Sequence, residues 1–289
     1  MTLNNNVIPF QLGHNSVRGN IVRLQNVVSE IVKRHKYPAN VESLFADTLT
    51  ITACLGSRMK HEGVFTIQAK GTGDVNTLFS DITSDGFLRG YVGLNAGFTN
   101  TESNFNSLMG SGHISFTLDQ GKHTKRYQGI VSLEESSISK TTELYFNNSE
   151  QLETKFLTFN YFDIEKNNRK NLFSAGLIML QKMPFKNSFD EESNEEIWQN
   201  SLNFLSTLGK EEFLSTNLTS DEILYRLFNE LGVTVYDEII IQDQCRCSEE
   251  KIKFVIKNLS KKELRDIVDE NGKVKVVCEF CRIERIFPG

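Results

Sequence analysis

The sequence has no long apolar run and no excess of positive charge. No stretch of about 18 apolar residues occurs, so we expect no membrane-spanning helix and no membrane partner. The formal net charge is −5, which disfavours general nucleic-acid binding, because neutralising phosphates requires clustered Lys and Arg. Residues 1–13 lack the charged and apolar regions of a secretory signal. We therefore expect a cytoplasmic protein.

Cysteine is scarce through most of the chain and concentrated near its end. Cys54 is the only cysteine before residue 245, whereas Cys245, Cys247, Cys278 and Cys281 all follow. Cys54 lies in an apolar segment and is predicted to be a small core residue. Thiols stay reduced in the cytoplasm, where structural disulfides are uncommon. The clustered cysteines therefore indicate metal binding or redox chemistry.

The length and composition predict a folded protein of two or three domains. A hydrophobic content of 39% over 289 residues is enough for a real core. Residues 1–182 mix helix and strand patterns and are predicted to form an α+β core domain with a largely antiparallel sheet. Helices are expected over 17–33, 41–55 and 140–151, a hairpin within 112–133, and strands within 153–166 and 171–182.

An acidic helical segment follows Pro184. Residues 183–233 hold ten acidic and three basic side chains, a charge of −7, yet apolar stripes run through them. Thr219 and Glu222 form a capping-box pattern, and Gly232 ends the helix that it opens. This segment is predicted to form amphipathic helices. They can dock on the core, or serve as a linker whose apolar faces are released, and both states can occur at different times.

Residues 234–289 are predicted to form a small domain organised by the four clustered cysteines. The spacing is C-x-C, thirty residues, then C-x-x-C, which can bring four sulfurs to one point, as tetrahedral zinc requires. Ser248 is expected to cap one helix, and Ser260 with Glu263 to open a second. An Asn-Gly turn then leads into a strand that ends at Cys278.

The small domain is too short to be stable on apolar packing alone. About 55 residues lie near the lower limit for a hydrophobic core. Structural zinc contributes roughly 10–16 kcal/mol of apparent binding free energy in small zinc-binding peptides. We therefore expect one Zn²⁺ per chain, and a domain that is folded with zinc and largely unfolded without it. Arg246 and Arg282 lie beside the cysteines and are expected to favour thiolates.

Several motifs together resemble the heat shock protein 33 family, the redox-regulated 33 kDa chaperonins of bacteria. The C-x-C-S and C-x-F-C pairs have that family's spacing and position. The resemblance extends to "VRGNIVRLQNVV", read as the family's first helix, and to "VFTIQAKGTGDVNTLFSD" and "GFLRGYV". It also includes "LMGSGHISFTLDQGKHTKRYQGIVSL" and "YFNNSEQLET". It therefore covers nearly the whole chain.

The resemblance implies a chaperone that holds unfolding proteins without ATP and is inactive while reduced and zinc-bound. By that carry-over the zinc ligands are Cys245, Cys247, Cys278 and Cys281. On oxidation, the resemblance implies, Cys245 pairs with Cys247 and Cys278 pairs with Cys281, and zinc is released.

The resemblance also implies which partners the chain has. Unfolded or partly folded client proteins would bind the freed linker, where Trp198, Phe204 and Phe228 are the candidate contacts. Oxidised members of the family form dimers, so a homodimer is expected for the oxidised chain.

Two other functions remain open from the sequence. One is a zinc-ribbon adaptor or nucleic-acid-binding protein, which the basic residues Arg246, Lys251, Lys253 and Lys261 would serve. The other is a thiol oxidoreductase that uses "CEFC". The sequence lacks the phosphate-binding G-x-x-x-x-G-K-[ST] loop and shows no other enzyme motif, so we do not expect an enzyme.

Overall fold

The computed structural model describes residues 5–98, 104–121, 124–162, 173–184 and 191–288. The chain divides into two compact units, Met1–Asp243 and Gln244–Gly289, and each is considered by itself. Both mix helices with antiparallel strands, which confirms the predicted α+β class. None of the helices in the described parts of the chain is long and apolar enough to cross a membrane.

The first unit contains two six-stranded sheets. One sheet has the order β10-β1-β2-β9-β8, with β11 also pairing to β1, and all of its pairs are antiparallel. Its strands are β1 (Asn5–Leu12), β2 (Val17–Leu24), β8 (Thr154–Phe162), β9 (Phe173–Lys182), β10 (Val233–Val235) and β11 (Ile239–Ile240). We call it the first sheet.

The second sheet has the order β12-β5-β4-β3-β6-β7. Its strands are β3 (Val64–Gly71), β4 (Val75–Thr83), β5 (Phe87–Leu94), β6 (Gly112–Asp119), β7 (Tyr127–Ser132) and β12 (Gln242–Asp243). The β5–β12 pair is parallel, and the other pairs of this sheet are antiparallel. β6 and β7 form the predicted hairpin.

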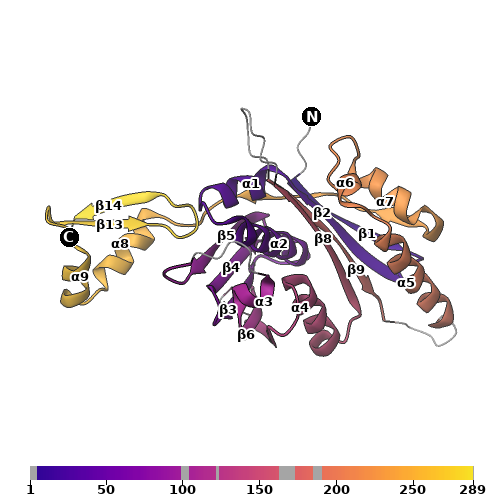
Figure 1. Cartoon of the computed structure of the whole chain (residues 1–289), viewed down its shortest axis with the longest axis horizontal. Coiled ribbons are helices and arrows are strands. Elements are labelled where there is room, and N and C mark those ends of the chain that lie inside the picture. Colours follow the sequence, from indigo (N-terminus) through magenta and orange to yellow (C-terminus); the bar gives the residue numbers. More distant parts are fainter. Residues whose placement is uncertain (1–4, 99–103, 122–123, 163–172, 185–190, 289) are drawn as a thin grey trace. The chain divides into compact units, whose positions relative to one another are not determined.

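Helix α2 (Ala39–Gly56) packs against strands of both sheets, and Figure 1 shows it between them. Thirteen of its residues are buried, because each side of the helix has a neighbour. Cys54 is fully buried in this helix, as predicted. The remaining helices on this side are α1 (Asn26–Lys33), α3 (Phe105–Met109) and α4 (Ile138–Tyr145), which runs into the π-helical turn η1 (Phe146–Glu150).

Three helices cover the other face of the first sheet, as Figure 1 shows. They are α5 (Glu191–Ser206), α6 (Lys210–Phe213) and α7 (Ser220–Phe228), followed by the 3-10 turn η3 (Asn229–Leu231). Side chains of β1, β2, β8 and β9 that point away from α2 meet the apolar stripes of these helices in one buried cluster. We call α5–α7 the linker helices.

The ends of the linker helices follow the predicted signals. Thr219 accepts a hydrogen bond from the backbone N–H of Glu222, whose carboxylate accepts one from the Thr219 N–H, which is the complete capping box. Gly232 has a φ of 70°, a left-handed conformation that glycine adopts without strain.

The second unit holds α8 (Glu249–Lys257), α9 (Lys261–Ile267), β13 (Lys273–Val277) and β14 (Glu284–Pro288). Ser248 caps α8, and Ser260 and Glu263 form the capping box of α9, as predicted. β13 and β14 make an antiparallel pair. Among the described residues of this unit, Val274 and Phe287 are the only buried apolar side chains.

The helix predicted over residues 17–33 is wrong in its first half. Residues 17–24 form strand β2, and only 26–33 form helix α1. β2 lies in the middle of the first sheet and is buried on both faces, so it lacks the alternation that marks a half-exposed strand. Its apolar residues therefore also fit helical spacing. The other predicted helices and strands of the core are confirmed where the structure describes them, whereas residues 163–166 and 171–172 of the two predicted strands lie outside the described residues.

The contact between the linker helices and the first sheet predicts a stability effect. Phe213 is fully buried and stacks on Phe159 with ring centroids 4.5 Å apart. Phe213→Ala should lower the free energy of unfolding by about 3–5 kcal/mol in urea titrations of the reduced protein. The control is Tyr225→Ala, because Tyr225 is 66% exposed on α7, and it should change that free energy by less than about 0.5 kcal/mol. Equal effects would contradict this packing.

Candidate metal centre

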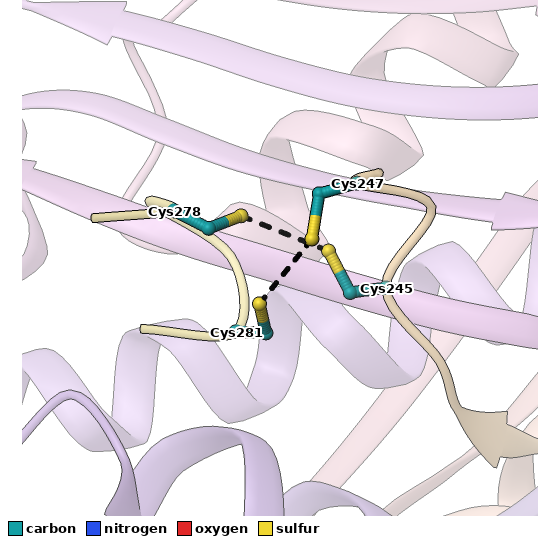
Figure 2. Close-up of side chains that lie close together, drawn as sticks. All are labelled: Cys245, Cys247, Cys278 and Cys281. Carbon is teal, nitrogen blue, oxygen red and sulfur yellow. Dashed lines mark hydrogen bonds between the residues drawn. The ribbon is translucent and has the colours of Figure 1, made fainter. Parts of the chain in front are cut away.

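The four clustered cysteines come from two loops of the second unit. Cys245 and Cys247 precede α8, and Cys278 and Cys281 lie in the turn from β13 to β14. Within this turn the Arg282 N–H donates to the Cys278 carbonyl at 2.9 Å, and Arg282 has a φ of 58°. The tight turn brings Cys278 and Cys281 to the same side, as Figure 2 shows.

The sulfur positions fit a tetrahedral metal site. All four Sγ atoms lie within 4.8 Å of one another. The Cys245–Cys278 Sγ atoms are 3.7 Å apart and the Cys247–Cys281 Sγ atoms 3.5 Å apart. Four sulfurs around zinc at Zn–S bonds of about 2.3 Å would be separated by about 3.8 Å. The donor set is therefore placed as a four-thiolate site requires.

The thiols do not ionise equally in the absence of a metal. Burial opposes ionisation of Cys247, but hydrogen bonds from the neighbouring thiols and from Arg285 outweigh it and lower its pKa to about 7. Burial raises the pKa of Cys281 to about 12, and the neighbouring sulfurs add to this effect. Burial likewise raises the pKa of Cys245. A divalent metal ion at the centre of the cluster would favour the thiolate form of all four cysteines.

Arg285 is the cation that sequence reasoning missed. It lies on β14 opposite Val276 and acts on the Cys247 sulfur. Arg282, which was expected to favour thiolates, pairs instead with Glu279 at 3.2 Å. The pairing of β13 with β14 brings Arg285 toward the cysteine sulfurs. A position next to a cysteine in the sequence does not by itself place an arginine side chain there.

The location of "CEFC" bears on the oxidoreductase alternative. In dithiol enzymes of that kind, the motif opens a helix beside a parallel βαβ unit. Here it lies between two antiparallel strands. No helix begins at Cys278 or Cys281 in the described part of this unit, so helix-terminus activation of the nucleophile has no structural basis.

The three candidate client-binding side chains belong to the linker helices and face the first sheet. Trp198 is 3% exposed and Phe228 is fully buried, stacked on Phe10 at 5.7 Å. Phe204 is partly buried against the same cluster. A client could not reach these surfaces while the helices are docked. Their role in client binding stays a prediction.

Polar contacts hold the linker helices in place. Arg23 on β2 is 3% exposed and donates to the Ser215 and Leu218 carbonyls at 2.5 and 2.6 Å. Both carbonyls belong to the loop between α6 and α7. The Trp198 indole N–H donates to Glu153 at 3.1 Å. The Arg23 contact could not be predicted from local patterns, because its acceptors are backbone groups almost two hundred residues away.

The chain is similar to known proteins over almost its whole length. The family model described as "Hsp33 protein" matches residues 5–288. The 33 kDa chaperonin of Caulobacter vibrioides is 32% identical over 292 residues, which cover 98% of this chain and 94% of that protein. The 33 kDa chaperonin of Pseudomonas syringae pv. syringae is 30% identical over 279 residues, covering 96% and 89%.

A solved structure is similar along the full chain. The crystal structure of the 33 kDa chaperonin (heat shock protein 33 homolog) from Thermotoga maritima matches with a TM-score of 0.80 and 24% identity, and the match covers 99% of this chain and 95% of that one. This similarity confirms the fold. The family model and the curated relatives both extend over almost the whole sequence, and on that evidence the chain belongs to the Hsp33 family.

Proposed function

We propose that this protein is a redox-regulated chaperone that holds unfolding proteins without ATP and is kept inactive by zinc at its four clustered cysteines. The observation that carries the proposal is the gathering of four sulfurs within 4.8 Å in a unit whose described residues bury only two apolar side chains. The name shared by its relatives, 33 kDa chaperonin, supports the chaperone part of the proposal.

Cys245, Cys247, Cys278 and Cys281 are the proposed ligands. Zinc fits this donor set, because thiolates are soft ligands and the sulfurs are arranged for tetrahedral coordination. When bound, zinc would supply a cross-link between the loop before α8 and the β13–β14 turn. The unit would depend on that link for its fold, since Val274 and Phe287 alone bury too little apolar surface.

Oxidation of the thiols would remove the donors. When peroxide oxidises a pair of cysteines, two electrons leave the sulfurs and one S–S bond forms. The O–O bond breaks and its oxygens leave as two water molecules; because zinc-bound cysteines would be thiolates, the two additional protons would come from the solvent. We propose the pairs Cys245–Cys247 and Cys278–Cys281. A C-x-C pair must bend the chain to close, so the first disulfide should be the more easily reduced.

The loss of fold in the second unit would reach the linker helices through a short segment. Residues 233–243 connect η3 to the second unit and are held by the short edge strands β10, β11 and β12. Arg34 and Asp243 form an ion pair at the end of this segment. Once these strands detach, α5–α7 lose their C-terminal support, and Trp198, Phe204 and Phe228 become available to clients.

The proposal also includes the organisation and setting of the chain. We propose that residues 1–182 act as the core, 183–233 as the releasable linker and 234–289 as the redox switch. The partners are unfolded or partly folded proteins in the cytoplasm, without nucleic acid or membrane. Oxidised chains would form a homodimer, which enlarges the apolar surface open to clients. No catalytic step is part of this function.

The metal site predicts a defined stoichiometry. Protein purified under reducing conditions should carry one zinc per chain by plasma mass spectrometry, and Cys278→Ser should lose most of it, because three thiolates hold zinc less tightly than four. Cys54→Ala is the matched control, since Cys54 is buried in α2, and it should keep one zinc. Wild-type protein without metal, or a Cys278→Ser variant that retains it, would contradict the site.

The redox switch predicts coupled zinc release and client protection. Peroxide with mild heat should release the zinc and suppress light scattering by a denatured client protein, whereas the reduced protein should not. Peptide mapping should find Cys245–Cys247 and Cys278–Cys281 disulfides. Mapping also tests the alternative pairing, since the sulfurs of Cys245 and Cys278 lie 3.7 Å apart and those of Cys247 and Cys281 lie 3.5 Å apart. Equal protection by both redox forms would refute the chaperone proposal.

The Arg23 contact predicts activation without oxidation. Arg23→Met removes two charge-assisted hydrogen bonds to the loop between α6 and α7, each contributing about 1.5–3 kcal/mol. The reduced variant should therefore protect the client partially while it keeps its zinc. Arg226→Met serves as the control, because Arg226 is exposed on α7 and lies 3.5 Å from Glu212. An inactive reduced Arg23→Met variant would show that these bonds do not restrain the linker helices.

A further inference from the structure

A cavity in the first unit has no role in the proposed function. Its volume is about 410 Å³, within the range of roughly 300–1,000 Å³ that is usual for small-molecule sites. The C-terminal end of α2, strands of both sheets, and the α4–η1 segment line it. The lining includes residues of "YFNNSEQ", a motif that neither the metal site nor the linker helices use.

One side of the cavity carries two arginines that share a neutral acceptor. Arg18 on β2 donates to Gln181 Oε1 from Nε at 2.9 Å and from Nη2 at 2.6 Å. Arg58, which follows α2, donates to the same oxygen from Nη1 at 3.3 Å. Within the described residues, the structure shows neither arginine paired with a carboxylate. Each guanidinium has five N–H donors, so donors remain for a further acceptor.

The positive charge on this side is only partly compensated by its surroundings. Burial lowers the pKa of Arg58 to about 10, and the nearby Arg18 charge contributes in the same direction. Two close guanidinium groups in a partly buried site favour an anion, because their mutual repulsion and lost hydration are then offset. Gln181 supplies an oxygen but no negative charge.

Three other polar groups of the lining are paired with one another. The Tyr127 and Tyr145 hydroxyls both donate to Glu150 Oε1 at 2.5 Å. Glu150 ends the π-helical turn η1, an element that occurs often at functional sites. The lining also includes the aromatic rings of Phe65, Phe116 and Phe146, which add apolar surface. The lining thus carries two positive charges, one engaged negative charge and a mainly apolar surface.

We propose that this cavity binds a straight-chain carboxylate, with its head group on Arg18 and Arg58 and its apolar chain among the aromatic rings. The carboxylate would accept from the free guanidinium donors beside Gln181, in the geometry that arginine offers to planar anions. The hydrocarbon chain of the ligand would bury apolar surface against Phe65, Phe116 and Phe146. This inference concerns the first unit alone and does not depend on the chaperone activity.

Decanoate, kept below its micelle concentration, is the probe for this site. Titration calorimetry on the reduced, zinc-loaded full chain should show saturable binding of one decanoate per chain. Arg58→Met should weaken the affinity about tenfold or more, since it removes a charge-assisted contact while keeping the length of the side chain. Arg226→Met changes an exposed arginine that does not line the cavity, so it should leave the affinity for decanoate unchanged.

Further ligands separate the parts of the proposal. Decan-1-ol should bind more weakly than decanoate, because it lacks the charge, and acetate should not bind measurably, because it lacks the chain. Arg18→Met provides a second variant with the same expectation as Arg58→Met, and circular dichroism checks that each variant is folded. The proposal is overturned if decanoate does not saturate, if both arginine variants bind it like wild type, or if decanol binds equally well. Tighter binding of a short peptide with a free apolar C-terminus would overturn the assignment to a small amphiphile.

Discussion

The second unit encloses very little apolar surface, and this limits how it can stay folded. Val274 and Phe287 are the buried apolar side chains among its described residues, whereas Phe254 is 69% exposed on α8. Capped helices and one strand pair supply local order but little burial. A metal ion bound by the four sulfurs, which lie within 4.8 Å of one another, would supply the stabilisation that apolar burial does not. Loss of those donors would then destabilise the whole unit.

The first unit, unlike the second, has more apolar surface than one layer of helices can cover. Its first sheet has an apolar surface on both faces. Ile178 and Leu180 face the linker helices, whereas Leu177 and Met179 face α2. The linker helices α5–α7 cover the second face, and in the sequence they lie shortly before the second unit. Arg23 adds a polar restraint to that apolar contact. An exposed apolar surface on the sheet would be unfavourable in water, so the docking of α5–α7 is the step on which the proposed redox control would have to act.

The polar groups of the first unit divide into satisfied and incompletely satisfied sets. The Tyr127 and Tyr145 hydroxyls both donate to Glu150, so these three groups are satisfied. Arg18 and Arg58 share one amide oxygen. Buried or partly buried charge without a counter-ion is costly, so its presence beside an apolar cavity marks a place where an external anion would be favoured. The carboxylate proposal follows from this imbalance and not from the shape of the cavity alone.

The sequence by itself determined the features that depend on near neighbours. The two cysteine pairs, the caps at Ser248, Thr219 and Ser260, and the burial of Cys54 could all be predicted, because they depend on spacing and local hydrogen bonds. Tertiary structure decided the rest. β2 is a strand because it lies between β1 and β9, although its apolar residues also fit a helix. The contacts of Arg23, Arg58 and Arg285 join groups distant in the chain or brought together by strand pairing. No local pattern encodes such contacts, because they form only when separate elements meet.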